Sequence, residues 1–186
     1  MTKTSPKGPR ADLAIASLSH DDPAVVLEAL DRIEESGDAR AILPLLRALT
    51  RFAPDATSTV DLARLTTRIT TLLHTVKAPG AAAELLHAMD LPEFTPVRNT
   101  IVAAFWNAGL DVQDHLDRFV AVAITGEAST TFECLTVIEN QEFWPVDAAA
   151  AGAMRIEQAL SSETDAYKRA MLEDIARELK ERADVR

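Results

Sequence analysis

The stretch that most constrains the fold runs from Asp22 to Phe52 and reads as two amphipathic helices joined by a tight turn. Asp22 followed by Pro23 marks the start of the first helix, because aspartate caps free amide groups and proline fits the first helical turn. Gly37 predicts the end of this helix, and Asp38 can cap the next one. Since each helix carries one apolar stripe, the pair needs neighbours to bury both stripes.

The apolar faces of this pair follow helical spacing. They consist of Val25, Val26, Ala29, Leu30 and Ile33 in the first helix and Ile42, Leu45, Leu46 and Leu49 in the second. Pro44 lies inside the second helix and predicts a kink there, because proline lacks an amide hydrogen and crowds the preceding turn.

The same pattern returns along the chain at a steady interval. Predicted first helices begin near Pro23, Thr59, Thr95 and Thr130, which lie 36, 36 and 35 residues apart. Near-constant spacing of helix pairs is typical of a stacked solenoid, whereas a single bundle does not require it.

Two later helices complete the pattern. An Ala-rich helix after Trp144-Pro145 is expected to turn Val146, Ala150, Met154 and Leu160 inward. A final charged helix is expected to close the C-terminal end of the stack. Its apolar stripe consists of Tyr167, Met171, Leu172, Ile175 and Leu179.

We therefore predict an all-α fold, built as a right-handed α-α superhelix of about four helix pairs with a C-terminal capping helix. A single domain is expected over residues 10–186, preceded by a flexible tail at residues 1–9.

The segment from Gly37 to Leu46, with Leu49 after it, resembles the turn and second helix of a HEAT repeat. That family places a Gly-Asp turn, a small residue, an aliphatic residue, a proline and a leucine pair in this order. In later pairs, Pro79 precedes a second helix, and Val97-Arg98 is similar to the family's first-helix start. The chain is most similar to short bacterial HEAT-repeat proteins, over roughly residues 20–160. The resemblance implies a HEAT-like, armadillo-like solenoid whose second helices line a concave surface.

Charge and composition exclude several classes of function. The formal net charge of −10 disfavours nucleic-acid binding, which needs a cationic surface. The single cysteine forms no intrachain disulfide and no zinc cage. Apolar runs such as 101–106 are far shorter than the roughly 20 residues that span a bilayer. The N-terminus also lacks the apolar segment of a secretory signal, so we expect a soluble cytoplasmic protein without membrane or nucleic-acid partners.

The only carboxylate–histidine cluster consists of Asp111, Asp114, His115 and Asp117. Asp111 and His115 share a helical face, so a metal could bridge them if another element supplied a third ligand. The alternative is a solvated helix start, where the helix dipole favours acidic residues. We favour the solvated start and expect no metal.

Other chemistry-bearing residues lack supporting motifs. Cys134 has no neighbouring base, so it is interpreted as a small core residue and not as a nucleophile. Trp106 is expected to continue a core stripe, whereas Trp144 suits a core or a partner-binding role equally. No phosphate-binding loop, dinucleotide fingerprint, zinc-protease motif or serine-hydrolase motif occurs, so we expect no cofactor and no catalytic residue.

The outward side of the second helices is the most informative surface. Arg40, Arg47 and Arg51 are spaced by 7 and 4 residues, which places them opposite the leucines. For any single residue the alternative is an ordinary solvated position. The predicted partner-binding residues are Arg40, Arg47, Arg51, Glu84, Asp114, Arg118, Asp147 and Arg155.

These patterns predict a non-catalytic scaffold or adaptor that binds a protein partner along a groove of mixed charge. A stack of helix pairs presents a long rigid surface without a deep apolar pocket, which suits extended recognition. We expect a monomer or weak homodimer, with self-pairing through the closing helix as one alternative. The other alternative is a HEAT-like enzyme or maturation factor, by resemblance to phycobilin lyases or to alkylpurine glycosylases, the latter disfavoured by the negative charge.

Overall fold

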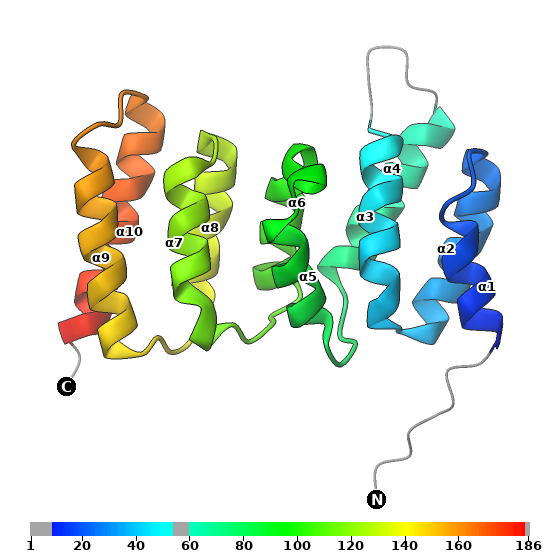
Figure 1. Ribbon diagram of the computed structural model, residues 1–186, viewed down its shortest axis with the longest axis horizontal. Helices are drawn as coiled ribbons and strands as arrows, with labels where there is room; N and C mark the ends of the chain where they lie inside the picture. The colour runs from blue at the N-terminus through cyan, green and yellow to red at the C-terminus, as the bar shows by residue number, and fades with distance from the viewer. Residues whose placement is uncertain (1–8, 54–59, 185–186) are drawn as a thin grey trace, which may run out of the picture. The chain divides into compact units, whose positions relative to one another are not determined.

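The computed structural model describes residues 9–53 and 60–184, which are helical with no strand among them (Figure 1). The α-helices are α1 Pro9–Ser17, α2 Pro23–Ser36, α3 Ile42–Arg51, α4 Val60–His74, α5 Ala81–Asp90, α6 Arg98–Asn107, α7 Leu116–Thr125, α8 Ala128–Asn140, α9 Val146–Leu160 and α10 Ala166–Asp184. The 3-10 helices are η1 Ala39–Ala41, η2 Pro92–Val97 and η3 Gln113–His115. The predicted all-α class is confirmed.

The chain divides into two compact units, Met1–Val97 and Arg98–Arg186, named unit 1 and unit 2 below. The tail predicted at residues 1–9 lies outside the described residues except for Pro9, which begins α1. The prediction of one domain over residues 10–186 stays a prediction. Within the part of the chain that is described, no helix combines the length and apolar character needed to cross a membrane.

The predicted start and stop signals of the first pair are confirmed. Asp22 Oδ1 accepts a hydrogen bond from the Ala24 amide at 2.9 Å, and Asp38 Oδ1 accepts one from the Arg40 amide at 3.1 Å. Gly37 ends α2 at φ 54°, a left-handed conformation in which a side chain would be strained. The helix expected after Asp38 is instead split into η1 and α3. The junction comes before Pro44, which then lies in the first turn of α3, where a missing amide hydrogen costs little.

In unit 1, the helices form two sets of neighbours. α2 packs beside α4, and α3 packs beside α5, while α1 packs on α2 and α3 also contacts α4. η2 closes this unit against α3 and α5. The core contains the fully buried side chains of Leu30, Leu46, Leu65, Ile69 and Leu85.

Unit 2 has the same two-layer arrangement. α8 packs between α6 and α10 in one layer, and α7 packs beside α9 in the other. In Figure 1, α7 and α9 lie in front of α8 and α10. The rings of Phe105 on α6 and Phe119 on α7 meet edge to face, with centroids 5.1 Å apart, and both are buried.

Among helices that follow one another in the chain, the extensive contacts are offset by one helix from the pairs expected from the sequence. They join α1 to α2, α3 to α4, α7 to α8 and α9 to α10, whereas α2 and α3 share few close contacts. The contact between α9 and α10 is the most extensive in the chain. The predicted capping helix is therefore an integral partner of α9.

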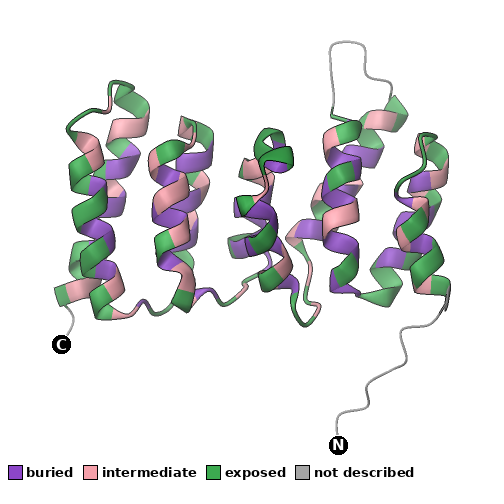
Figure 2. Cartoon of the chain, viewed as in Figure 1, coloured by how far each residue is buried: buried purple, intermediate pink, exposed green. Residues whose placement is uncertain are grey.

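Most residues expected to face inward are buried (Figure 2), but some large apolar ones are exposed. Tyr167 of the closing helix is 68% exposed, and the large apolar residues Leu13 of α1 and Phe132 of α8 are 65% and 48% exposed. In α8, Thr131 and Cys134 are fully buried, whereas the neighbouring Phe132 is not. Small and half-polar residues there pack between helices, so the bulky ring turns outward.

Candidate partner-binding surfaces

Arg40 is held within unit 1 by two carboxylates. Its Nη2 lies 2.6 Å from Asp38 Oδ2 and 3.0 Å from Asp12 Oδ1. The hydrogen bond with Asp38 is the main cause that raises the pKa of the guanidinium above its usual value. Arg40 therefore ties the first turn of α1 to η1.

The two α3 arginines are also engaged. Arg47 Nη2 lies 3.1 Å from Glu93 Oε1, and its guanidinium carbon is 6.0 Å from the centre of the Phe94 ring. Arg51 Nη1 donates to the carbonyls of Ser19 at 3.0 Å and His20 at 2.8 Å, after the end of α1. Of the three predicted arginines in unit 1, Arg47 has the most open side chain, 51% exposed.

The other predicted site residues lie on or beside second helices. Glu84 is half-buried on α5 of unit 1. In unit 2, Asp114 and Asp147 are exposed, and Arg118 is half-buried on α7. Arg155 on α9 donates to the Asp117 carbonyl of α7 at 3.4 Å. The eight predicted residues thus divide equally between the two units.

The inward face expected for α9 is wrong. Val146 is 45% exposed and Met154 71% exposed, and Ala150 between them is exposed as well. The buried face consists of Ala149, Gly152, Ala153 and Ile156.

The cause of this rotation is the glycine. A Cβ on Gly152 would lie 3.0 Å from Leu179 Cδ1 and 3.3 Å from Val120 Cγ2. Only the smallest residue lets α9 approach both α10 and α7 so closely.

The rotation leaves an outward surface on α9 that we call the α9 surface. It consists of Val146, Asp147, Ala150, Met154 and Arg155. The three apolar residues recur every four positions, with one acidic and one basic residue beside them. In the sequence, the small residues at 149, 152 and 153 were the feature that could have predicted which face of α9 is buried.

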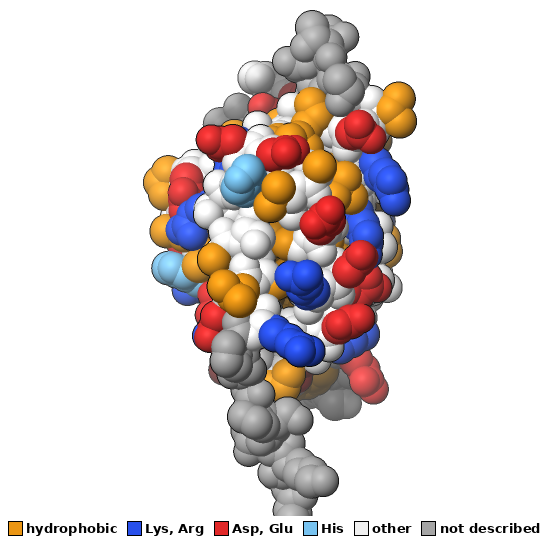
Figure 3. All heavy atoms as spheres, turned by 90° about the vertical axis from the view of Figure 1, so that its right-hand side faces the viewer, with side chains coloured by type: hydrophobic (Ala, Val, Ile, Leu, Met, Phe, Trp, Pro, Cys, Tyr) orange, Lys and Arg blue, Asp and Glu red, His pale blue; other side chains and the backbone are white. Residues whose placement is uncertain are grey.

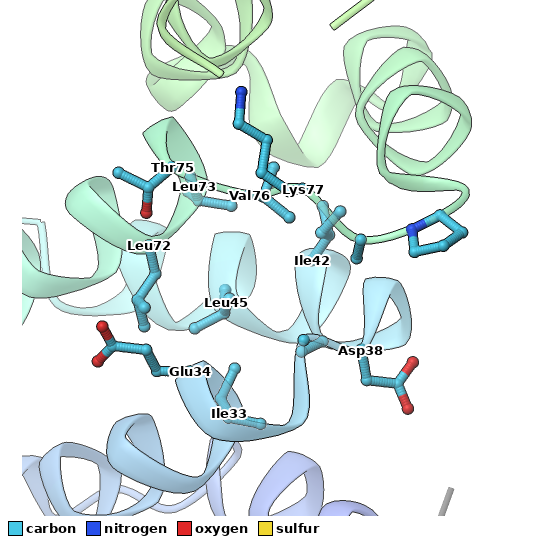
Figure 4. A pocket seen from close by; sticks show the side chains of 14 residues that line it. Ile33, Glu34, Asp38, Ile42, Leu45, Leu72, Leu73, Thr75, Val76 and Lys77 are labelled. Atoms are coloured by element: carbon cyan, nitrogen blue, oxygen red, sulfur yellow. The ribbon is translucent and has the colours of Figure 1, made fainter. Parts of the chain in front are cut away.

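Unit 1 contains an apolar hollow of about 460 Å³ between the ends of α2 and α4 and the start of α3 (Figure 4). Its lining includes Ile33, Ile42, Leu45, Leu72 and Leu73, with Glu34, Asp38 and Lys77 also contributing. Both carboxylates are engaged, since Glu34 Oε2 lies 3.2 Å from Arg68 Nη2, and Asp38 binds Arg40.

Unit 2 contains a more polar hollow of about 440 Å³, which we call the aromatic hollow. Its lining consists of Phe105, Trp106, Gly109, Leu110, Asp111, Gln113, Val137, Asn140, Gln141, Glu142 and Phe143. Trp106 was expected in the core but is 36% exposed, with its indole Nε1–H donating to Glu133 Oε2 at 2.8 Å. Trp144, for which both roles were open, is buried and donates to the Ile138 carbonyl at 3.1 Å.

The cysteine and the acidic cluster considered in the sequence analysis have surroundings typical of structural residues. Cys134 is fully buried, and burial raises the pKa of its thiol well above the usual value, which disfavours the thiolate. Asp111 Oδ1 accepts a hydrogen bond from the Gln113 amide at 3.1 Å, two residues along the chain. Among the described residues, no group of three or more histidine, cysteine, aspartate and glutamate side chains is placed to hold a metal ion.

Charges of both signs are interspersed on the face of unit 1 that Figure 3 shows. No large field of one sign dominates that face, so it offers no broad cationic platform for a polyanion. Comparisons with models of known families, with curated proteins and with solved structures find no match to this chain.

Proposed function

We propose that the chain is a HEAT-like α-solenoid that acts as a non-catalytic adaptor and binds a protein partner along its second helices. The layered packing within each unit supports this architecture, since α3 neighbours α5 and α7 neighbours α9 as second helices do in stacked repeats. A curved stack with its second helices on one surface presents a long, rigid platform for an extended partner.

The observation that carries the proposal is the α9 surface. Val146 and Met154 are exposed on a helix that already buries a separate apolar face against α7 and α10. Exposed apolar side chains with charged neighbours are typical of protein contact surfaces, and methionine adapts well to a partner's shape. Asp147 and Arg155 add a charge of each sign for orientation.

We expect this chain to be a monomer or a weak homodimer in the cytoplasm when it binds its partner. Self-pairing through the α10 stripe is disfavoured, because Met171, Leu172, Ile175 and Leu179 are buried. That stripe already packs within unit 2, where α10 contacts α9 and α8.

The test is affinity capture from native cells with purified wild-type protein and the variant Met154→Asp as parallel baits. A charge in the centre of an apolar contact is expected to reduce capture of the specific partner at least tenfold, since it leaves an uncompensated charge at the interface. Tyr167→Asp is the matched control, because Tyr167 is similarly exposed in the same unit but lies on α10. Equal capture by wild type and Met154→Asp would contradict the proposal, provided that circular dichroism shows both folded.

A further inference from the structure

The aromatic hollow of unit 2 has two exposed aromatic side chains in its wall. Trp106 from α6 is 36% exposed, and Phe143 from the loop before α9 is 57% exposed. Buried Phe105 and Val137 also line the hollow. The Glu133 carboxylate accepts a hydrogen bond from the Trp106 indole N–H. This bond orients the ring and places a negative charge at its edge. An aromatic face open to solvent is an attractive site for a cation, because the ring quadrupole is negative there.

The charges of the hollow have one sign. Asp111 and Glu142 are exposed carboxylates, and no lysine or arginine is among the described residues that line it. The Asp111 carboxylate is held in place, since Oδ1 accepts from the Gln113 amide at 3.1 Å and from Gln141 Nε2 at 3.3 Å. A cationic ligand would thus meet in Asp111 a carboxylate that needs little reorganisation.

A neighbouring arginine does not neutralise these carboxylates. Arg182 reaches the same loop from α10 and donates to the carbonyls of Gln141 at 2.6 Å and Glu139 at 3.0 Å. Its Nε is paired with Glu178 Oε1 at 2.6 Å. The arginine and its own carboxylate therefore form a balanced pair behind the loop.

We infer that the aromatic hollow binds an arginine side chain of a peptide segment, with the guanidinium between the aromatic rings and the carboxylates. The volume of about 440 Å³ accommodates a long side chain and part of its backbone. Arginine fits better than lysine, because its planar guanidinium stacks on aromatic faces and donates a fork of hydrogen bonds to carboxylates. The site is separate from the α9 surface and does not rest on the function proposed for it.

The test uses the full chain labelled with ¹⁵N and the signals of its two indole N–H groups. Trp106 reports the hollow, and buried Trp144 serves as an internal control. The probe is the peptide acetyl-Gly-Ser-Arg-Ser-Gly-amide, compared with the same peptide carrying citrulline or lysine. We expect the arginine peptide to shift the Trp106 signal saturably and to leave Trp144 unchanged. A cation–aromatic contact of about 2 kcal/mol and two carboxylate contacts of about 1 kcal/mol each correspond together to a Kd of roughly 1 mM.

Two pairs of variants locate the contact. Phe143→Ala is expected to weaken binding about 2- to 30-fold, whereas Phe132→Ala, which removes an exposed ring outside the hollow, leaves it unchanged. Glu142→Gln is expected to weaken binding about 5-fold, whereas Glu139→Gln, three residues away along the chain and outside the lining, has a smaller effect.

The inference is overturned by an unmoved Trp106 signal at about 10 mM arginine peptide, a concentration well above the expected Kd. Equal shifts with the citrulline peptide would also overturn it, because the charge would then be irrelevant. Equal affinity for the lysine peptide overturns the assignment to arginine. The unchanged Trp144 signal shows in each variant that unit 2 remains folded.

Discussion

At the scale of single residues, Thr131 shows how a polar side chain can be a core component. It is fully buried at the start of α8, and its one hydroxyl hydrogen is shared between the Ala123 carbonyl at 3.0 Å and the Glu127 carbonyl at 3.1 Å. The Ala123 carbonyl lies in the last turn of α7, where helix geometry leaves carbonyls without amide partners. One side chain thus joins the end of α7 to α8.

We predict that Thr131→Val lowers the free energy of unfolding by about 1–3 kcal/mol, because valine keeps the shape and leaves a buried carbonyl unpaired. Urea unfolding measures the loss. Thr136→Val is the matched control on the same helix, since the Thr136 hydroxyl bonds only the Phe132 carbonyl of its own helix at 3.0 Å. The control is expected to change stability by less than about 0.5 kcal/mol. Equal losses in both variants would show that the Thr131 bridge contributes nothing specific.

The two tryptophans show which residue-level features the sequence cannot predict. Spacing placed Trp106 on a core stripe, but its indole instead extends to Glu133, which is 27 residues away. Trp144 lies beyond the end of α8, and its indole is fixed by the Ile138 carbonyl in the last turn of that helix, six residues back. Both outcomes depend on tertiary hydrogen bonds, which helical periodicity does not encode. The carboxylate–aromatic lining of the aromatic hollow was therefore absent from the sequence-based site.

At the scale of elements, helix existence and helix ends were predictable because their signals are local. The caps at Asp22 and Asp38 and the turn at Gly37 need only neighbouring residues. The start of α10 is also capped locally, because Asp165 Oδ1 accepts from the amides of residues 167 and 168. It is harder to predict which face an Ala-rich helix buries, because α9 has apolar residues on more than one side. Packing of Gly152 against its neighbours decides between them.

We predict that Gly152→Val lowers the free energy of unfolding by about 1–3 kcal/mol, the usual loss when extra carbons enter a filled core. Leu179 and Val120 already lie at contact distance from the position of a Cβ. Ala151→Val provides the control, because it places the same branched side chain one residue away at an exposed position. Its loss is expected to stay below about 0.7 kcal/mol, the range of helix propensities. Similar losses in thermal unfolding of both variants would mean that α9 is not closely packed at Gly152.

At the scale of the whole molecule, the two units raise the question of cooperativity. The sequence predicted repeated helix pairs but not the offset by which α3 packs on α4 and α9 on α10, in place of the expected pairs α2–α3 and α8–α9. Repeat period defines which helices are equivalent, and it does not determine which neighbours approach most closely. In a continuous solenoid, neighbouring repeats stabilise one another, so a local loss of stability spreads along the stack.

This coupling is measurable because both tryptophans, Trp106 and Trp144, belong to unit 2. Leu46→Ala removes a fully buried side chain from unit 1 and is expected to lower stability by about 2–5 kcal/mol. If the proposed solenoid is continuous, tryptophan fluorescence excited at about 295 nm, where tryptophan dominates the signal, will show the same lowered urea midpoint as circular dichroism. The shift should be about 1 M or more. A tryptophan transition that stays at the wild-type midpoint while the helical signal of unit 1 is lost would mean that the units unfold independently. The continuous superhelix would then be wrong, and partner binding by the α9 surface would be a property of unit 2 alone.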